Sequence, residues 1–521
     1  MFNPLVHTGD TLKKVITGDV WLDMPTREQF STATCMYKVM PIGVVAPKQI
    51  DDVQRLVRFC TDNQISIVPR GGATGLVGQA IGSGIVADFT KHLNRIIGIN
   101  KDQTTVTLQP GCILDQLTAY LRERNKFYPV DPQSMKTCTL GGNIATNAAG
   151  PHGIKYGSTK DHISELTVIL SNGDAATLTN DRVISSDAST IAMFEAARQL
   201  LAGNEKFIKS RAPKVAKNSS GYNIYDSIND GQLNPVRLFC GSEGTLGIIA
   251  EATLKIYEQP RHNVSAVVYC SGYEQTAQAV QFALSQSPSA VELLDKSYTV
   301  VGKGIDPSID ALISHDFQSM LIIEMDGNDR DAIINQLNRL LSNLLEQKLI
   351  TTCQILLTEK DRSALWMLRE EVSQRLNTNQ DQYQKASFIE DGTVPVSNLP
   401  EFMTGVKTIL DTYKIPFSLY GHAGTGNIHC ATFVDFTTEG RRIIEAAAVD
   451  VFDLLLSLDG SFSGEHGDGF VRTPFLEKEF GPEIYRIFTE IKNIFDPHNI
   501  FNPGKIVGKQ DGNFLHDIKY V

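Results

Sequence analysis

Residues 69–78 read Pro69-Arg70-Gly71-Gly72-Ala73-Thr74-Gly75-Leu76-Val77-Gly78. They follow an apolar segment, Ile65–Val68, which predicts a short strand. Four glycines within ten residues allow the main chain to approach a ligand closely and to turn its N–H groups toward it. Such a loop suits a pyrophosphate group. An ordinary tight turn is the simpler alternative, and the added Arg70 and Thr74 speak against it.

Two better-known phosphate-binding motifs do not account for this loop. The sequence contains no G-x-x-x-x-G-K-[ST] pattern, which excludes a Walker loop. The segment Gly82-Ser83-Gly84-Ile85-Val86-Ala87 matches G-x-G-x-x-A by letters, but Val86–Phe89 after it predicts a strand. Because the dinucleotide-binding mechanism of that motif requires the start of a helix there, the match is a false positive.

Two further glycine-rich segments follow in the first half of the chain. The first reads Thr139-Leu140-Gly141-Gly142-Asn143-Ile144-Ala145-Thr146-Asn147-Ala148-Ala149-Gly150 and carries no charged side chain. Its small residues permit close contact, and its Asn and Thr side chains offer uncharged hydrogen bonds, which suits a large, flat, neutral ligand. The second reads Gly241-Ser242-Glu243-Gly244-Thr245-Leu246-Gly247 and enters an apolar strand that includes Ile249.

The second half of the chain holds the candidate reactive groups. Gly421-His422-Ala423-Gly424-Thr425-Gly426-Asn427-Ile428-His429 places two histidines on either side of a glycine turn, and Gly464-Glu465-His466-Gly467 follows about 36 residues later. A strand–turn–strand arrangement would bring both imidazoles to one side. Two His and one Glu form a known catalytic metal set that leaves positions open for substrate. A lone histidine is more often a surface or core residue, but here three of eleven histidines fall in two such turns.

The glycine segments, with Lys155-Tyr156-Gly157 between them, resemble the FAD-binding domain of the vanillyl-alcohol oxidase type in order and spacing, from about residue 37 to 258. The resemblance implies an α+β fold of the vanillyl-alcohol oxidase / p-cresol methylhydroxylase type, with two subdomains that hold FAD non-covalently. The residues expected to bind FAD are Arg70, Gly71, Gly72, Thr74, Gly75, Leu76, Gly141, Gly142, Asn143, Thr146, Asn147, Ile249 and Asn502.

The histidine turns resemble the C-terminal domain of FAD-linked 2-hydroxy acid dehydrogenases, the D-lactate, D-2-hydroxyglutarate and glycolate enzymes. With the ending Asn502-Pro503-Gly504-Lys505, the resemblance extends from about residue 37 to 506. It implies a divalent metal, zinc in the usual case, on His422, His429 and Glu465, and a catalytic base at His466. It also implies that the substrate is bound by Arg369, a catalytic-site residue, and by Asn427; Ser373, one helical turn after Arg369, falls on the same face.

These groups suit the oxidation of a small D-2-hydroxy acid to a 2-oxo acid. The acid can chelate the metal through its carboxylate and hydroxyl, and the metal lowers the pKa of that hydroxyl. His466 takes the proton, with a base pKa suited to neutral pH, and Arg369 holds the carboxylate by two parallel bonds. The C2 hydrogen leaves as hydride to the flavin. A carbanion route stays open, and so does the reading of Arg369 as a helix-surface residue paired with a neighbouring Glu.

One departure from the family bears on the substrate. Several members carry a lysine six residues before the proline of their D-x-x-x-P motif. Here that position is Ile389, and Lys385 lies four residues earlier. Either Lys385 substitutes for it, or the substrate is bulkier or less charged at its far end. The identity of the hydroxy acid therefore stays open.

The pattern of elements divides the chain into an FAD-binding domain (1–258), a substrate or cap domain (259–480) and a C-terminal helical segment (481–521) that returns to the first domain. From about residue 262, short strands alternate with amphipathic helices, which predicts an antiparallel sheet covered by helices on one face. The clearest of these helices lies near residues 332–345.

Composition limits the remaining possibilities. A net charge of -11 argues against nucleic acid as the main partner. The eight cysteines form no C-x-x-C pair, which favours buried free thiols and excludes an iron–sulfur cluster. No signal peptide or apolar run of about 18 residues is present, so we expect a cytoplasmic protein, with peripheral membrane docking and a homodimer left open. The electron acceptor is external. A non-redox transferase of the alkyl-dihydroxyacetone-phosphate synthase kind, or a flavin electron-transfer subunit, is the alternative.

Overall fold

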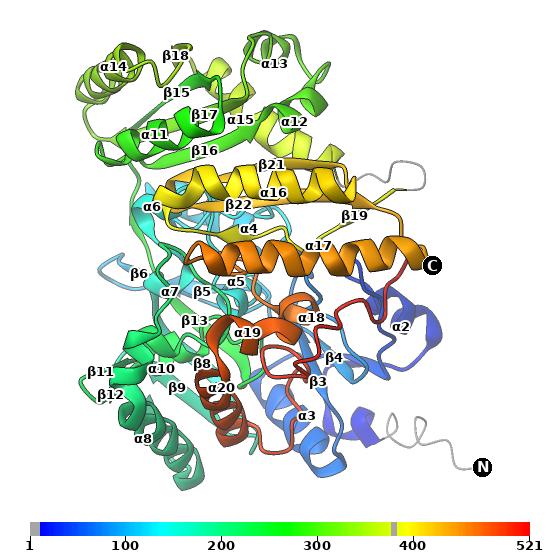
Figure 1. Cartoon of the computed structure of the whole chain (residues 1–521). Helices are drawn as coiled ribbons and strands as arrows, with labels where there is room; N and C mark the ends of the chain where they lie inside the picture. The colour runs from blue at the N-terminus through cyan, green and yellow to red at the C-terminus, as the bar shows by residue number, and fades with distance from the viewer. Residues whose placement is uncertain (1–10, 377–382, 521) are drawn as a thin grey trace.

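The structure, a computed structural model, describes residues 11–376 and 383–520, and its first half is built on two sheets (Figure 1). The smaller sheet has the order β1-β2-β4-β3, with β1 Asp19–Trp21 antiparallel and β2 Gly43–Ala46, β4 Ile85–Asp88 and β3 Ile67–Arg70 parallel. Helix α3 (Ile50–Asn63) packs an apolar face against this sheet. The glycine loop at residues 71–78 therefore leaves the sheet at the carboxyl end of β3.

The larger sheet of the first half is antiparallel, with the order β10-β9-β8-β13-β6-β5. Its central strand β13 (Ile248–Lys255) alternates buried and half-buried residues, as a sheet covered on one face requires. The other strands are β5 Ile96–Ile99, β6 Thr105–Leu108, β8 Ile163–Ile169, β9 Ala175–Thr179 and β10 Val183–Ile184. Helices α4 (Leu114–Arg122), α5 (Leu140–Thr146) and α8 (Ala188–Ser210) contribute to the core under this sheet.

Short elements complete this half of the chain. Strand β7 (Lys126–Phe127) pairs with β14 (Tyr257–Glu258), and β11 (Ile228–Asn229) pairs with β12 (Gln232–Leu233). The short helices are α2 Met24–Phe30, α6 Gly153–Tyr156, α7 Thr159–His162, α9 Ile224–Ser227 and α10 Pro235–Phe239.

A third sheet, antiparallel throughout, begins at β15 and forms the cap in the upper part of Figure 1. Its order is β18-β15-β17-β16-β21-β22-β19, and β20 also pairs with β22. The strands are β15 His262–Cys270, β16 Ala290–Asp295, β17 Ser319–Gly327, β18 Thr352–Leu356, β19 Gln384–Ala386, β20 Gly392–Thr393, β21 Phe417–His422 and β22 Asn427–Val434.

Helices cover both faces of the cap sheet, so the prediction of helices on one face was wrong. One face packs against α11 (Tyr273–Leu284), α14 (Arg330–Glu346), α16 (Leu399–Tyr413) and α17 (Thr438–Ser457). The other packs against α12 (Lys296–Thr299), α13 (Pro307–Leu312) and α15 (Glu359–Arg375). The physical reason is that α15 also has an apolar side, formed by Leu365, Leu368 and Val372. The 3-10 helices are η1 Val300–Gly302, η2 Val396–Asn398, η3 Ala423–Thr425 and η4 Thr473–Phe475.

The end of the chain returns to the first half through α18 (Gly469–Arg472), α19 (Leu476–Phe480) and α20 (Pro482–Phe495). Helix α20 lies beside α8 at the bottom of Figure 1 and buries Ile484, Ile487 and Phe488 in the core of the larger sheet. The main chain of residue 502 then donates to Ile67 O at 2.8 Å, next to β3. The segment that follows the loop at 464–469 thus contacts the strand that precedes the glycine loop.

The cap sheet starts at His262, after β14 has ended at Glu258 in the first half. The divisions of the chain at residues 258 and 480 remain predictions. Across the described parts of the chain, no helix combines the length and apolar character that crossing a membrane requires.

Candidate active site

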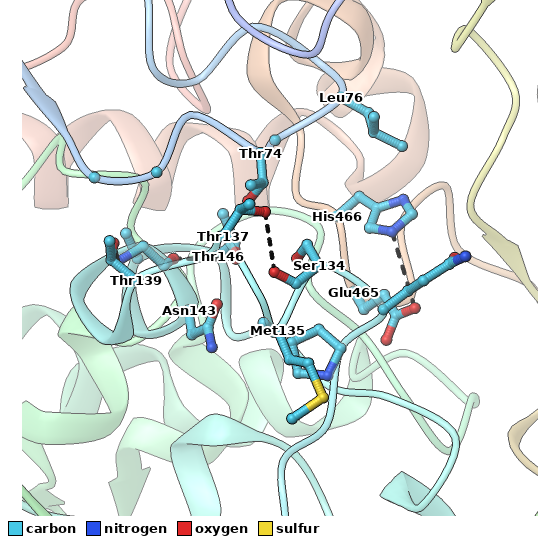
Figure 2. Close-up of a pocket in the computed structure, with 18 of the residues that line it drawn as sticks. Thr74, Leu76, Ser134, Met135, Thr137, Thr139, Asn143, Thr146, Glu465 and His466 are labelled. Atoms are coloured by element: carbon cyan, nitrogen blue, oxygen red, sulfur yellow. Dashed lines mark hydrogen bonds and ion pairs between the residues drawn. The ribbon is translucent and has the colours of Figure 1, made fainter. Parts of the chain in front are cut away.

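A cavity of about 720 Å³ lies where the first half of the chain meets the cap. Its walls are the glycine loop after β3, the segment 131–139, helix α5 and side chains of the cap sheet and α15. Figure 2 shows Thr139, Asn143 and Thr146 on one side of this cavity, and Glu465 and His466 on the other. The predicted cofactor residues and the predicted reactive residues therefore share one space.

All the cofactor candidates line this cavity except Asn147 and Asn502. Asn147 ends α5 in a left-handed conformation, and its Nδ2 donates to Ser219 Oγ at 3.3 Å. Asn502 Nδ2 donates to the main-chain oxygens of Gln79 and Glu243, at 2.9 and 2.8 Å. Both residues support the cavity wall from behind.

The glycines of the first loop serve packing between two segments of chain. A Cβ added at Gly71 would lie 2.0 Å from Thr139 Oγ1, and one added at Gly72 would lie 2.1 Å from Thr137 O. The loop can therefore lie directly on residues 137–139 only because these side chains are absent. Thr139 in turn caps α5 by accepting from Gly142 N.

The cavity also offers an unused donor to a ligand. Among the described residues, Asn143 Nδ2 is buried and has no hydrogen-bond partner in the protein, although Asn143 lines the cavity. Buried polar atoms are normally paired, so an unpaired donor in a cavity wall marks a place for a ligand acceptor. The glycine-rich part of the lining and this donor fit FAD.

The hairpin of β21 and β22 places both candidate histidines on one face of the cap sheet. Tyr420 pairs with His429 across the two strands, and His422 follows two residues after Tyr420, so all three side chains point the same way. Both imidazoles are buried, and their rings lie 5.1 Å apart, edge to face. The strand–turn–strand arrangement expected from the sequence is present.

Both imidazoles direct the same ring atom toward Glu465. His422 Nε2 lies 2.9 Å from Glu465 Oε1, and His429 Nε2 lies 3.2 Å from the same oxygen. Their other ring nitrogens already have acceptors, because His422 Nδ1 contacts Glu292 Oε1 at 2.7 Å and His429 Nδ1 contacts Glu390 O at 3.1 Å. In the neutral rings, the Nδ1 hydrogens are committed to these partners and both Nε2 lone pairs face the carboxylate.

Asp391 organises the loop that presents Glu465. Its Oδ2 accepts from the main-chain nitrogens of Glu465 and His466 at 3.0 and 2.8 Å, and from Ser463 Oγ at 2.7 Å. Its Oδ1 accepts from Asn427 Nδ2 at 3.0 Å. Asn427 is fully buried behind the histidines and does not line the cavity, so its predicted contact with substrate remains a prediction.

A second grouping of possible ligands consists of Asp391, His429, Glu465 and His466, whose ligand atoms lie within 4.8 Å of one another. Both oxygens of Asp391 are already used by the loop and by Asn427. His422 Nε2 has no other partner than Glu465 Oε1 among the described residues, so His422 is the better candidate for a third ligand.

His466 stands at the edge of the cluster and reaches the cavity. Its Nδ1 lies 2.7 Å from Glu390 Oε2, and Arg472 Nη2 holds Glu390 Oε1 at 3.0 Å. Its ring stacks on that of His429 at 5.0 Å, and its Nε2 lies 3.9 Å from Glu465 Oε1. The side chain is 27% exposed, whereas the rest of the cluster is buried.

The charges around this cluster shift its titrations. Burial opposes the charged form of His466, but the carboxylates of Glu390 and Asp391 outweigh it and raise the pKa of His466 to about 9. In the protein without a bound cation, the pKa of His466 therefore lies above the near-neutral value that we expected for a base. Burial likewise opposes ionisation of Glu465, but Lys217 and His422 hold the pKa of Glu465 well below its usual value. Burial lowers the pKa of His429.

Arg369 lines the cavity from α15. Its Nε donates to Glu292 Oε2 at 3.3 Å, its Nη1 donates to Gln133 Oε1 at 3.3 Å, and its guanidinium lies 4.7 Å from the centre of the Tyr420 ring. It is buried, so the reading of Arg369 as a surface residue is wrong. The side chain of Ser373 lies outside those that the structure describes.

Several functional residues were not identified from the sequence. They are Lys217, Glu292, Glu390, Asp391 and Arg472. All are buried; the first four contact a predicted site residue, and Arg472 contacts Glu390. The available signal was a charged residue inside an apolar run, as with Glu292 in Val291–Asp295. Lys217 gave no such signal, because it lies in a long polar stretch.

Comparison with known proteins identifies two matching families. The model of the FAD binding domain matches residues 41–179, and the model of the C-terminal domain of FAD linked oxidases matches residues 259–506. The glycolate oxidase subunit GlcD of Bacillus subtilis (strain 168) is 30% identical over 483 residues, covering 92% of this chain and 91% of that protein.

Two other relatives carry related names. The D-lactate dehydrogenase of Anaerostipes hadrus is 28% identical over 508 residues, covering 95% of each chain. The D-2-hydroxyglutarate dehydrogenase of Escherichia coli (strain K12) is 28% identical over 513 residues, and this chain covers only 50% of its length.

Solved structures confirm the predicted fold. p-Cresol methylhydroxylase with substrate bound matches with a TM-score of 0.69 at 13% identity, covering 98% of each chain. Alkyldihydroxyacetonephosphate synthase matches with a TM-score of 0.67 at 18% identity, covering 96% of this chain and 86% of that one. At these identities the matches show the α+β architecture of the vanillyl-alcohol oxidase / p-cresol methylhydroxylase type and nothing about the reaction.

Proposed function

Because this chain belongs to the family of FAD-linked oxidases, we propose that it oxidises a small D-2-hydroxy acid to the 2-oxo acid. The proposal includes non-covalent FAD, a divalent cation on His422, His429 and Glu465, a base at His466, and an external electron acceptor. Relatives named for glycolate, D-lactate and D-2-hydroxyglutarate support the substrate class.

One observation carries the proposal: three possible ligand atoms from two segments of the chain converge on one point beside the cavity. His422 Nε2 and His429 Nε2 lie 2.9 and 3.2 Å from Glu465 Oε1. Ligand atoms at about 2.0–2.1 Å from a tetrahedral zinc ion are about 3.3 Å apart, close to these separations. Two imidazole nitrogens and one carboxylate oxygen at these separations are a donor set that fits a divalent cation, with zinc the expected ion.

The buried charges of the site also balance once a cation and a substrate are counted. With His466 neutral, Lys217, Arg369 and Arg472 contribute three positive charges, and Glu292, Glu390, Asp391 and Glu465 contribute four negative charges. A divalent cation would leave a charge of about +1, which the carboxylate of a hydroxy acid matches. The cation would thereby supply Lewis-acid polarisation of the hydroxyl.

The protein's own residues bind the acid and move its proton. Arg369 can hold the carboxylate through the N–H groups that Glu292 and Gln133 leave free. His466 Nε2 faces the cavity and takes the hydroxyl proton, while Glu390 fixes the ring through Nδ1. FAD, when bound, supplies a two-electron acceptor for the C2 hydrogen. A divalent cation beside His466 would disfavour the ring's positive charge and so favour the neutral form that a base requires.

The test is a panel of 2-hydroxy acids assayed by dye reduction with the FAD-loaded protein, with and without a chelator, and again after zinc is restored. At least one D-hydroxy acid should reduce the dye, chelator should abolish the activity, and zinc should restore it. His429→Ala should be inactive, whereas the exposed His498→Ala serves as the matched control with unchanged turnover. Full activity in a chelated protein, or in His429→Ala, would contradict the proposal.

The same assay separates the two alternatives. A transferase of the alkyl-dihydroxyacetone-phosphate synthase kind would reduce no dye with hydroxy acids. An electron-transfer subunit would need a second chain before any hydroxy acid reduced the dye.

A further inference from the structure

One carboxylate touches both the metal cluster and the substrate arginine. Glu292 lies in β16, where Val291 and Leu293 beside it are apolar, and it is completely buried. Its Oε1 lies 2.7 Å from His422 Nδ1, and its Oε2 lies 3.3 Å from Arg369 Nε. A buried carboxylate is expensive to keep ionised unless it is paired, and here both oxygens are paired.

From this geometry we propose that Glu292 is a positioning residue that couples cation binding at His422 to hydroxy-acid binding at Arg369. The inference rests on the proposed function, because it takes His422 as a cation ligand and Arg369 as the carboxylate site.

On the side of His422, Glu292 fixes the tautomer. A carboxylate that accepts from Nδ1–H leaves the Nε2 lone pair for a cation and makes that nitrogen more basic. His429 differs, since its Nδ1 faces the main-chain oxygen of Glu390 at 3.1 Å. Of the two imidazoles, His422 therefore depends on a side chain that substitution can remove.

On the side of Arg369, Glu292 fixes the orientation of the guanidinium. Glu292 accepts a hydrogen bond from Nε, and Gln133 accepts one from Nη1. The centre of the Tyr420 ring lies 4.7 Å from the guanidinium carbon. The remaining N–H groups are left toward the cavity that Arg369 lines. Substitution of Glu292 would therefore allow the guanidinium of Arg369 to reorient, although Arg369 would keep its charge.

The two contacts compete for the charge of one carboxylate, and this competition is the source of the coupling. When Arg369 is neutralised by a bound carboxylate, Glu292 can interact more strongly with His422, which favours a cation on Nε2. Linkage requires the converse, so a bound cation should favour the hydroxy acid by the same factor.

The experiment measures two affinities on FAD-loaded protein. Zinc affinity is measured by competition with a chromophoric chelator, without hydroxy acid, and the KM for the best hydroxy acid is then measured at saturating zinc. Glu292→Gln should bind zinc about 10- to 100-fold more weakly, the range for loss of a carboxylate that orients a metal-ligating histidine. It should also raise KM at saturating zinc, because Arg369 loses its anchor.

Glu324→Gln is the matched control. Glu324 is a buried glutamate of β17 on the same face of the sheet, since Glu292 pairs with Ile322 two residues away. It contacts His152 Nε2 at 2.9 Å and Ser265 Oγ at 2.7 Å, and neither His422 nor Arg369. Its zinc affinity should equal that of the unmodified protein.

The outcomes distinguish the inference from the proposed function. If the unmodified protein binds zinc and His429→Ala does not, the cation site stands. An unchanged zinc affinity or an unchanged KM in Glu292→Gln then overturns the coupling alone. If the unmodified protein binds no zinc at this site, both fall. Should Glu292→Gln fail to retain FAD, Glu292→Asp keeps the charge but withdraws it by one methylene, and it must weaken both affinities.

Discussion

Lys217 Nζ contacts Glu465 Oε2, and this buried ion pair joins the two halves of the chain. Lys217 comes from the segment after α8, and Glu465 comes from the loop after α17. The ammonium also contacts Asn427 Oδ1 at 3.3 Å. Because Lys217 occupies one oxygen of Glu465, the other is left to face His422 and His429.

Removal of this ammonium should destabilise the protein most when no cation is present. Lys217→Met leaves the buried Glu465 without its positive partner, a loss of about 3–5 kcal/mol for a buried pair. Zinc on Glu465 would replace part of that charge, so the fall in unfolding midpoint should be larger in chelator than in zinc. Chemical denaturation under both conditions measures the difference.

Lys214→Met provides the control for this prediction. Lys214 pairs with Asp459 at 3.0 Å, but both side chains are exposed, at 70% and 57%, and such pairs contribute about 0–1 kcal/mol. An equal loss in chelator and in zinc for Lys217→Met would contradict the idea that zinc occupies Glu465.

Glu390 should control turnover through the orientation of His466. Glu390→Gln keeps the size of the side chain but weakens the 2.7 Å contact that fixes Nδ1. We expect kcat to fall about 10- to 100-fold, within the range of general-base effects, while KM changes little. Steady-state kinetics with the best hydroxy acid checks this. Glu401→Gln, exposed on α16, should leave both constants unchanged. A raised KM with intact kcat would place Glu390 in substrate binding instead.

Local patterns predicted those elements whose partners lie close in sequence. The apolar face of α3, the alternation of β13 and the hairpin that joins His422 to His429 all follow from periods of 3.6 or 2 and from glycine turns. The glycine loop after β3 was likewise recognisable, although its glycines pack against residues 137–139 as well as lining the cavity.

The supporting residues of the site could not be found this way, because their partners are remote. Lys217 meets Glu465 across 248 positions, and Glu292 meets His422 across 130. Nothing in the local sequence distinguishes Lys217 from a solvated lysine. The same limitation explains α15, whose Leu365, Leu368 and Val372 pack on the second face of the cap sheet.

His152 should make stability depend on pH above neutrality. Burial opposes its charge, but Asp131 at 2.6 Å and Glu324 at 2.9 Å raise the pKa of His152 well above its usual value. A group with a raised folded-state pKa contributes its full stabilisation below the unfolded pKa of about 6.5, and loses it as pH rises through the folded pKa.

The advantage of the unmodified protein over His152→Gln in unfolding free energy should therefore be constant at mildly acid pH. It should then fall by up to about 1.4 kcal/mol per pH unit in the alkaline range. Denaturant titrations at a series of pH values measure this difference. His498→Gln, an exposed histidine, should show no such trend. A difference that grows with pH would have the wrong sign for this explanation.

Gly72→Ala should weaken FAD binding. The added Cβ would lie 2.1 Å from Thr137 O, which is main chain and cannot rotate away. Overpacking of this kind costs about 1–3 kcal/mol, which corresponds to about 5- to 150-fold in FAD affinity if the loop binds the cofactor. Flavin retention after dialysis against chaotropic salt measures it. In Gly203→Ala the new Cβ meets nothing within 4 Å, inside α8, so flavin should be retained and the helix slightly stabilised.

Lys385 should decide how the protein treats hydroxy acids that carry a second carboxylate. Ile389 is buried in the apolar core of the cap, whereas Lys385 lines the cavity. Lys385 pairs with Phe433, which lies on the same face of β22 as His429. It is two strands from Tyr420, over which Arg369 lies, and four residues further along the strands, so the two positions are roughly 16 Å apart. Flexible side chains reach inward from both positions, so one acid can bridge them.

Lys385→Met should therefore raise KM about 10- to 100-fold for a dicarboxylic D-hydroxy acid, the effect of losing a hydrogen bond to a charged group. It should leave KM for a monocarboxylic acid such as glycolate nearly unchanged, because Arg369 alone holds its carboxylate. Lys407→Met, exposed on α16, should alter neither. Kinetics on paired acids of increasing length make the comparison. A loss shared equally by both classes would assign Lys385 to the structure of the cavity and would leave Arg369 as the residue that selects substrate.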